Sequence, residues 1–550
     1  MSKYLKLFET TSQYNEYITS IDVVLPNVSV AKDAPSTVYF NPLPPHDYSE
    51  DYLTLSALED GEITITIPAG VNATYAKSLS YSKDKSSWVD TTIDNTEQII
   101  TIPVSNGEDV YLKGEAEQWG LIAYGEHGSY SEVFLSIGSS ANIIISGNIM
   151  SLLYGDNFKG KTVFPQGSEY SFWQLFRNNT HLINAENLIL PATTLADYCY
   201  SYMFRDCTAL ETAPALPAMK LTSYCYQYMF SGCTSLTTAP ELPATTLAPY
   251  CYQNMFQDCT SLTTAPKLPA TTLAPYCYSS MFSGCTSLTT APELPATKLT
   301  ERCYYCMFQN CSSLTTAPEL PATTLANDCY LQMFNGCTSL TTAPELPATT
   351  LANDCYQQMF NGCTSLTTAP ELPATKLKTN CYYYMFQGCT SLTTAPVLPA
   401  TELAYQCYDG MFSGCTSLTT APELPATTLV DYCYDSMFSG CSSLTTAPAL
   451  PATKLAPSCY DGMFSGCSSL TTAPELPAYT LATYCYNSMF NGCEKLNSIT
   501  MLATDISAWD CLNNWVNGVA STGTFTKATS MASLPTGNSG IPSGWTVIDK

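Results

Sequence analysis

Apolar residues recur along most of the chain with a period of 26 residues. Between Met333 and Cys363 the sequence reads MFNGCTSLTTAPELPATTLANDCYQQMFNGC, so this stretch begins and ends on the same five letters. Cysteines mark the same period, because all except Cys306 and Cys511 fall in twelve pairs whose members lie eight residues apart. A fixed period of about 20–50 residues predicts an array or solenoid, in which each unit buries its apolar face against its neighbour.

Each unit contains an apolar segment, represented by CYSSMFSGC at 277–285. Its first cysteine, its methionine and its second cysteine lie at i, i+4 and i+8. A tyrosine directly follows the first cysteine, and a phenylalanine directly follows the methionine. This spacing predicts a short helix with one buried face. The predicted core ladder consists of Cys277, Met281, Phe282 and Cys285.

The other part of the unit is rich in threonine, leucine and proline, as in LTTAPKLPATTL at 262–273. Proline does not favour a central strand, so a short strand at LTTA followed by a turning stretch is predicted. The repeats therefore predict an α/β solenoid of 26-residue units with short parallel strands and short helices.

The 26 cysteines are interpreted as buried packing residues. Eight helical residues span about 12 Å, whereas a disulfide needs Cα atoms less than about 7 Å apart. Zinc is disfavoured, because the repeats lack a recurring histidine and their one CxxC pair is Cys303–Cys306. Cys306 lies outside the two cysteine columns and is predicted to be partly exposed. No metal site is predicted.

The pattern changes on either side of the repeats. Strings such as YLTLSALEDGEITITIPAG alternate apolar and polar residues around an Asp-Gly turn, which predicts a small all-β sandwich. The opening segment is either a flexible arm or a docking segment. The predicted regions are 1–48 (docking arm and linker), 49–140 (β-sandwich), 141–190 (N-terminal cap and degenerate first repeat), 191–497 (solenoid) and 498–550 (C-terminal cap). Trp173 fits the first cap, and the second cap is predicted to cover the core with Trp509, Trp515 and Trp545.

Charge and hydropathy exclude several classes of partner. The net charge of −25 makes a nucleic-acid backbone an unfavourable partner. No apolar run approaches the ~20 residues of a membrane-spanning helix, so membrane insertion is not expected. The first residues contain no apolar segment typical of a secretion signal, so the chain is expected to fold in a cytoplasm.

No catalytic set can be assembled from the sequence. The three histidines, His46, His127 and His181, are far apart, and nucleotide-binding and metalloprotease motifs are absent. A glycosidase would need only two carboxylates, so the repeated glutamates were considered. The candidate acidic strip is Glu293, Glu319, Glu345 and Glu371. It is either a strip for a cation or basic partner, or a solvated row screened by salt. Because the same column accepts Lys267, Val397 and Ala449, we predict no enzyme activity and no cofactor.

The positions that differ between copies flank the CY pair. Three residues before it and two after it vary, whereas SLTTAPELPAT hardly changes. This variation reflects either recognition of a partner or drift after duplication. Tyrosine offers a large amphipathic surface, so the candidate recognition surface is Tyr228, Tyr305, Tyr383 and Tyr384.

The unit resembles the BspA-like leucine-rich repeat, on the strings MFSGCTSL (281–288), MFNGCTSL (333–340) and MFSGCSSL (463–470). Met stands where that family usually has Ala, and the preceding CY is an addition. The resemblance covers about residues 180–500 and implies a leucine-rich-repeat solenoid with a parallel sheet along one side.

The tail from Asn497 is similar to closing segments in Bacteroidetes and their phages. The opening KYLKLFETTSQYNEYITSIDVVLPNVSV is similar to virion proteins of Bacteroides-infecting phages, the crAss-like group included.

Members of these groups act mostly as surface or virion binding proteins. The resemblance therefore implies a phage tail or other exposed appendage that presents the solenoid for host attachment. The implied partners are other virion proteins at the N-terminal region, further copies of the chain, and a glycan or protein of the bacterial surface. The alternatives are a bacterial cell-surface adhesin and, third, a glycan-cleaving tail enzyme.

Overall fold

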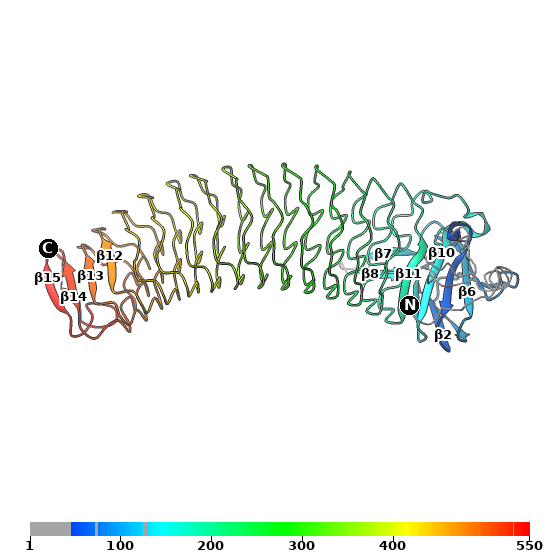
Figure 1. Ribbon diagram of the computed structural model, residues 1–550, viewed down its shortest axis with the longest axis horizontal. Coiled ribbons are helices and arrows are strands. Elements are labelled where there is room, and N and C mark those ends of the chain that lie inside the picture. The colour runs from blue at the N-terminus through cyan, green and yellow to red at the C-terminus, as the bar shows by residue number, and fades with distance from the viewer. Residues whose placement is uncertain (1–45, 72–74, 125–129, 532) are drawn as a thin grey trace, which may run out of the picture.

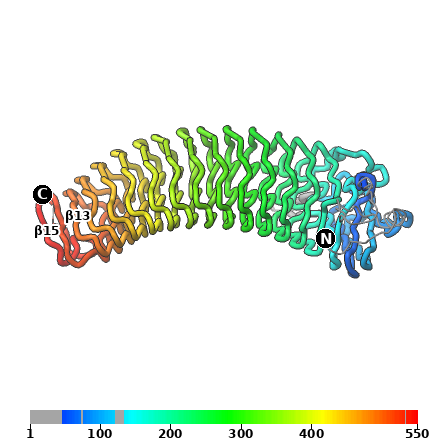
Figure 2. The backbone as a smooth tube through the Cα atoms, in the orientation of Figure 1, coloured from blue at the N-terminus to red at the C-terminus, as the bar shows by residue number. Residues whose placement is uncertain are grey.

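A computed structural model of the chain describes residues 46–71, 75–124, 130–531 and 533–550. A strand-rich N-terminal region is followed by a long, curved row of stacked coils, with the C-terminus at the far end (Figures 1 and 2). Residues 1–45 of the predicted docking arm, 1–48, lie outside the described part of the chain.

The N-terminal region contains mostly antiparallel strands, as its alternating sequence predicts. Its elements are η1 (Tyr48–Glu50), β1 (Leu53–Ala57), β2 (Gly61–Ile67), β3 (Ala76–Ser82), β4 (Val89–Thr91), β5 (Gln98–Val104), β6 (Asp109–Ala116), β7 (Gly120–Tyr124), β8 (Tyr130–Phe134), β9 (Ser136–Ser139), β10 (Ile143–Asn148) and β11 (Leu182–Ile189). A six-stranded sheet has the order β11-β10-β1-β6-β3-β4, a three-stranded sheet the order β5-β2-β9, and β7 pairs with β8. Side chains of both larger sheets belong to one cluster of buried hydrophobic residues.

The sheet of the N-terminal region continues into the stack of coils. β10 pairs antiparallel with β1 and parallel with β11, and Asn184 of β11 forms a parallel bridge with Thr212 of the next coil. Between β10 and β11 lie α2 (Ser151–Tyr154), the one α-helix in the described residues, and η3 (Gly155–Asn157). The buried Phe176 stacks on Phe204 of the next coil with ring centroids 5.5 Å apart. On the other side, the Ile137 N–H of β9 donates to the Leu175 carbonyl at 2.8 Å, so the N-terminal sheets pack on the first coil.

The segment predicted as a helix is instead a row of consecutive turns, so that prediction was wrong. Between 276 and 285, alternate N–H groups bond within the coil to the carbonyl three residues back, as Met281 does to Tyr278 at 3.2 Å. The N–H groups between them bond to the next coil, as Phe282 does to Met307 at 2.9 Å. Every fourth residue is left-handed, as Gly284 shows with φ of 76°. An α-helix cannot form here, because half of its donors are used between coils.

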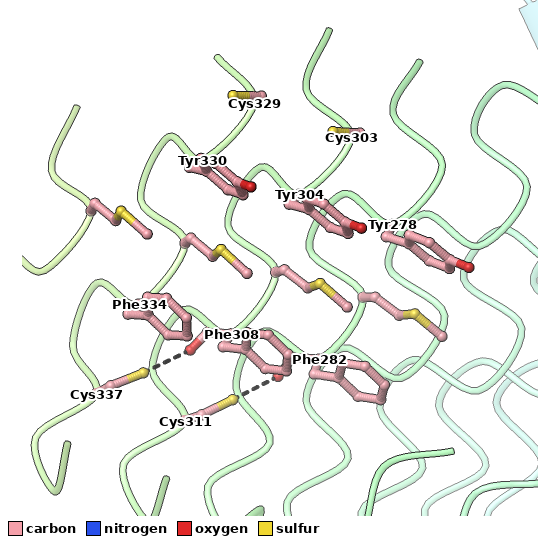
Figure 3. Packing of buried hydrophobic residues seen from close by; sticks show 14 of the residues in the cluster. Tyr278, Phe282, Cys303, Tyr304, Phe308, Cys311, Cys329, Tyr330, Phe334 and Cys337 are labelled. Carbon is pink, nitrogen blue, oxygen red and sulfur yellow. Dashed lines mark hydrogen bonds between the residues drawn. The ribbon is translucent and has the colours of Figure 1, made fainter. Parts of the chain in front are cut away.

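The row of turns has a period of four residues, and it buries the residues of the predicted core ladder. Cys277, Met281, Phe282 and Cys285 are all 0% exposed. Equivalent rings stack from coil to coil: the centroids of Phe282 and Phe308 lie 5.7 Å apart with planes within 5° of parallel (Figure 3). These columns form a continuous core, as expected for units that bury their apolar faces against each other.

The other side of most coils forms single parallel bridges instead of short strands. Thr264, for example, bridges to Thr238 and Thr290. Two prolines follow closely in each of these segments, and each removes one backbone donor, so the ladder between two such segments stays short. Regular parallel strands appear near the C-terminus, where a last segment with the repeat string TAPEL pairs with SITM, and TFTK and TVID follow. They are β12 (Thr472–Leu476), β13 (Ser498–Met501), β14 (Thr524–Lys527) and β15 (Thr546–Asp549), paired in that order.

All 26 cysteines are free and buried. In the second column, each Sγ donates to a phenylalanine carbonyl of the preceding coil, as Cys311 does to Phe282 at 3.1 Å and Cys337 to Phe308 at 3.0 Å (Figure 3). Cys306, predicted to be partly exposed, is only 3% exposed, because its Sγ turns to Gln332 Oε1 on the next coil at 3.2 Å. The cysteines are therefore packing residues, and the second column also satisfies a carbonyl lone pair.

We expect the native protein to resist thiol reagents. Burial raises the pKa of the Cys306 thiol and of the Cys311 thiol to about 12, so almost no thiolate is present at neutral pH. An aromatic disulfide reagent should therefore detect no free thiol in the native chain and all 26 after unfolding in guanidinium. Rapid reaction of several thiols under native conditions would show that the stacked coils open.

Candidate interaction surface

The four tyrosines of the predicted recognition surface all lie on the row of turns, but they form no single patch. Each is half-buried, and Tyr228, Tyr305 and the pair Tyr383–Tyr384 lie on coils several steps apart. The Tyr228 ring lies 5.3 Å from the Arg205 guanidinium, and Tyr305 lies 5.8 Å from that of Arg302. Tyr383 and Tyr384 meet edge to face with centroids 4.4 Å apart. Burial raises the pKa of Tyr305 and of Tyr384 to about 12, so both hydroxyls stay protonated.

A longer ladder of tyrosines lies beside these residues and was not predicted. Its half-buried rings stack with centroids 4.5–4.9 Å apart. The rings are those of Tyr170, Tyr198, Tyr224, Tyr250 and Tyr276. Trp173 packs against one end, and Arg302 lies over the other. The ring faces of this ladder are therefore covered, which leaves edges and hydroxyl groups for any partner. The signal was visible in the sequence, since a tyrosine precedes CY in successive units.

Several variable positions form hydrogen bonds between neighbouring coils. The Gln227 amide donates to Gln253 at 2.7 Å, and the Asn380 amide donates to Asp354 at 2.9 Å. Each bond joins residues 26 positions apart, so a change in one copy alters what fits in the next. Part of the sequence variation therefore reflects hydrogen bonding between side chains of neighbouring coils. This cause is separate from both partner recognition and drift.

A column of one buried and two half-buried aspartates lies in the C-terminal half of the row of turns. Asp409 is 5% exposed, and Asp435 and Asp461 occupy the same position on the next two coils. Burial raises the pKa of Asp409 and of Asp435 to about 7, with the charge of Asp409 adding to the effect at Asp435. This column was not predicted, because three aspartates among eleven different pairs after CY are not a distinctive pattern.

The predicted acidic strip lies on the opposite, proline-containing side of the coils. Glu293, Glu319, Glu345 and Glu371 are all exposed. Within the described part of the chain, no group of three or more His, Cys, Asp or Glu side chains could hold a metal ion. Exposed carboxylates in water are screened by salt, which favours the solvated row.

We therefore expect calcium to leave the melting temperature unchanged at low ionic strength. Each carboxylate of the strip faces solvent, so an added cation gains little by replacing water there. Thermal unfolding with calcium chloride, compared with sodium chloride of equal ionic strength, measures this. A rise in melting temperature specific to calcium would identify the strip as a cation site.

No catalytic constellation is brought together by the fold in the residues described. His46 pairs with Asp51, and the His181 Nδ1 lies 3.4 Å from Thr180 Oγ1. His127 lies outside the described residues. None of the described helices is both long and apolar enough to cross a bilayer.

The C-terminal cap uses only two of its three tryptophans to cover the core. Trp515 is 0% exposed and Trp545 8%, and their indole N–H groups donate to the carbonyls of Gly540 and Ala520. Trp509 is 69% exposed, so the prediction that it covers the core was wrong. It lies on the row of turns, two residues before Cys511, in a column whose members are exposed or half-buried in the other coils.

The stacked coils, their apolar ladders and the variable row of turns define a repeat protein with an extended contact surface and no assembled catalytic site in its described residues. A scan of protein families matches "BspA type leucine rich repeat region (6 copies)" over residues 176–315, 252–393, 308–445 and 383–509. These matches span more than half of the 550 residues, so the chain belongs to the BspA-type leucine-rich-repeat family. Searches of curated proteins and of solved structures found no match. BspA-type repeats are typical of binding and adhesin-type proteins.

Proposed function

We propose that this protein is a binding protein of a phage particle, whose solenoid extends from a tail or another appendage to contact the bacterial surface. The family match over residues 176–509 carries the binding function. The phage origin rests on the similarity of residues 3–30 to virion proteins. A bacterial cell-surface adhesin is the alternative, and the family match fits it equally well.

In this proposal the N-terminal region attaches the chain to other virion proteins and to further copies of itself, and the coils remain outside. The protein is made in the host cytoplasm and ends in the exposed part of the virion. The regular stack supports such a role, because coils that repeat one set of contacts can span a long distance without a separate core for each unit. The net charge of −25 disfavours nucleic acid as the partner.

Two measurements test the two parts of this proposal. Mass spectrometry of purified particles should find the chain, and its absence would overturn the virion assignment. Fluorescently labelled full-length protein should bind whole Bacteroides cells in a saturable manner. Failure to bind any strain that the phage infects would overturn the attachment role.

A further inference from the structure

Trp509 is the most exposed aromatic side chain among the large hydrophobic residues that the structure places at the surface. Its exposed fraction is 69%, compared with 59% for Tyr479 and 46% for Tyr405. A single exposed apolar residue is ordinary at a protein surface. Trp509 differs because tryptophan offers a large, flat contact surface and because this indole is held in a fixed position.

The indole is held in place by the neighbouring coil. The Trp509 carbonyl accepts the Tyr484 N–H at 3.1 Å, and the Trp509 Nε1–H donates to Tyr484 Oη at 3.0 Å. Just before it, Asp505 Oδ1 accepts the N–H and the hydroxyl of Ser507, which fixes the loop. The ring is thus pre-organised, so that little conformational entropy would be lost when a ligand binds.

In the described part of the chain, no aromatic ring or cation packs on the face of Trp509, in contrast to the tyrosine ladder. There the terminal ring of Tyr276 is covered by Arg302 at 5.4 Å. A free π-face carries partial negative charge. It therefore attracts the C–H groups on one face of a sugar ring, which are weakly positive.

Polar residues suited to sugar hydroxyls lie close to Trp509 along the chain. Asn513 follows Trp509 by one four-residue turn of the same row. Asn513 is exposed, and its amide contacts Asn487 at 3.2 Å. Asp505 and Asp510 are exposed nearby. Their negative charge would repel a uronic or sialic acid, whereas a neutral sugar can accept hydrogen bonds from the amides and donate to the carboxylates.

We propose that Trp509, Tyr484 and Asn513 form a binding site for the pyranose ring of a neutral glycan. The site deepens the proposed function and rests on it, because a surface glycan is one of the partners that attachment requires. Its place at the end of the stack farthest from the N-terminal region leaves it accessible when that region is attached to a particle.

An immobilised array of neutral gluco-, manno-, galacto- and xylo-oligosaccharides, with matching uronic acid oligosaccharides, tests the site with the full-length protein. We expect binding to at least one neutral series and none to the uronic acids. With the best neutral oligosaccharide, Trp509→Ala should weaken binding by at least about ten-fold, as is typical for loss of a central aromatic contact. Trp509→Phe should retain most of the affinity, because the ring face remains.

Tyr405→Ala is the matched control, since Tyr405 is an exposed aromatic residue in the same column of an earlier coil. It should leave binding unchanged. Binding of no neutral oligosaccharide, or equal binding by Trp509→Ala, would overturn the glycan site. An unchanged thermal unfolding curve shows that each variant is folded, which the exposure of both residues leads us to expect.

Cell binding separates this site from the proposed function. If the parent and Trp509→Ala bind cells equally, attachment stands and the glycan site is wrong. If the parent binds a neutral oligosaccharide through Trp509 but no cells, the glycan site stands and attachment is wrong. If Trp509→Ala loses cell binding and the parent binds no oligosaccharide, the indole contacts a protein, which also overturns the glycan site.

Discussion

Deleting residues 338–363 should produce a folded rod that is one coil shorter. The deletion removes 26 residues and joins Cys337 to Thr364, which is the same junction as in the parent sequence. Every remaining coil then meets a neighbour with the same core columns, so the nearest-neighbour contacts that stabilise a repeat array are kept. We expect a cooperative thermal transition, lower than that of the parent by no more than a few degrees.

Deleting residues 338–350 should unfold the array around the junction. This change removes 13 residues, namely the threonine- and proline-containing side of one coil, and joins two rows of turns directly. The coil cannot close, and the N–H groups that bond from one row of turns to the next lose their acceptors. Circular dichroism and thiol reactivity measure the result, because exposed cysteines report opened coils. A cooperative, thiol-protected 13-residue deletion would contradict the stacking of 26-residue coils.

The core and its period could be predicted from the sequence, whereas the local conformation could not. Burial of Cys277, Met281 and Cys285 follows from their spacing of four residues. Over only nine residues, that spacing fits an α-helix of 3.6 residues per turn as well as a row of four-residue turns. The distinguishing feature is a left-handed residue at every fourth position. Glycine marks it in the MFSG string, but Tyr276 and Ser280 occupy it elsewhere, and such residues carry no glycine signal.

The sequence could locate the variable surface but could not show which of its residues contact one another. Repetition shows which columns vary, so the sequence located the row of turns that carries Tyr228 and Tyr384. It could not show that rings and amides 26 residues apart contact each other, because those contacts depend on the tight spacing between coils. Nor could it separate Trp509 from Trp515, since both follow the last regular unit. Only the packing shows that one of them covers the core and the other faces solvent.

Raising the pH from about 5 to about 8 should destabilise the C-terminal half of the stack, through Asp409, Asp435 and Asp461. The Gln406 amide donates to Asp409 Oδ2 at 3.1 Å, Ser436 Oγ donates to Asp435 Oδ1 at 2.8 Å, and Asn487 donates to Asp461 Oδ1 at 2.9 Å. Tyr383 and Tyr384 lie beside the column on the coil before Asp409. Burial raises the pKa of Asp409 and of Asp435 to about 7, and it also raises that of Asp461.

The direction of the pH effect on stability follows from the state, folded or unfolded, in which the proton binds more tightly. The folded chain holds the Asp409 proton with a pKa of about 7, whereas an unperturbed aspartate has a pKa of 3.8. The folded state therefore binds more protons between these two values, and stability is greatest below pH about 4 and falls as the pH rises through about 7. For Asp409 the free energy of unfolding falls by at most about 4 kcal/mol over the whole range between these two pKa values, since each pKa unit is worth about 1.36 kcal/mol.

Asp409→Asn should remove most of this pH dependence at its site, because an amide has the shape of the protonated carboxyl and cannot ionise. We expect the variant to match the parent near pH 4 and to unfold at higher denaturant concentration than the parent at pH 8. Asp431→Asn is the control, since Asp431 is exposed on a neighbouring coil and should keep the parent's profile. Guanidinium unfolding at a series of pH values measures both variants. If the parent were equally stable at pH 5 and pH 8, or if Asp409→Asn changed with pH as the parent does, the buried column would not hold protons at neutral pH.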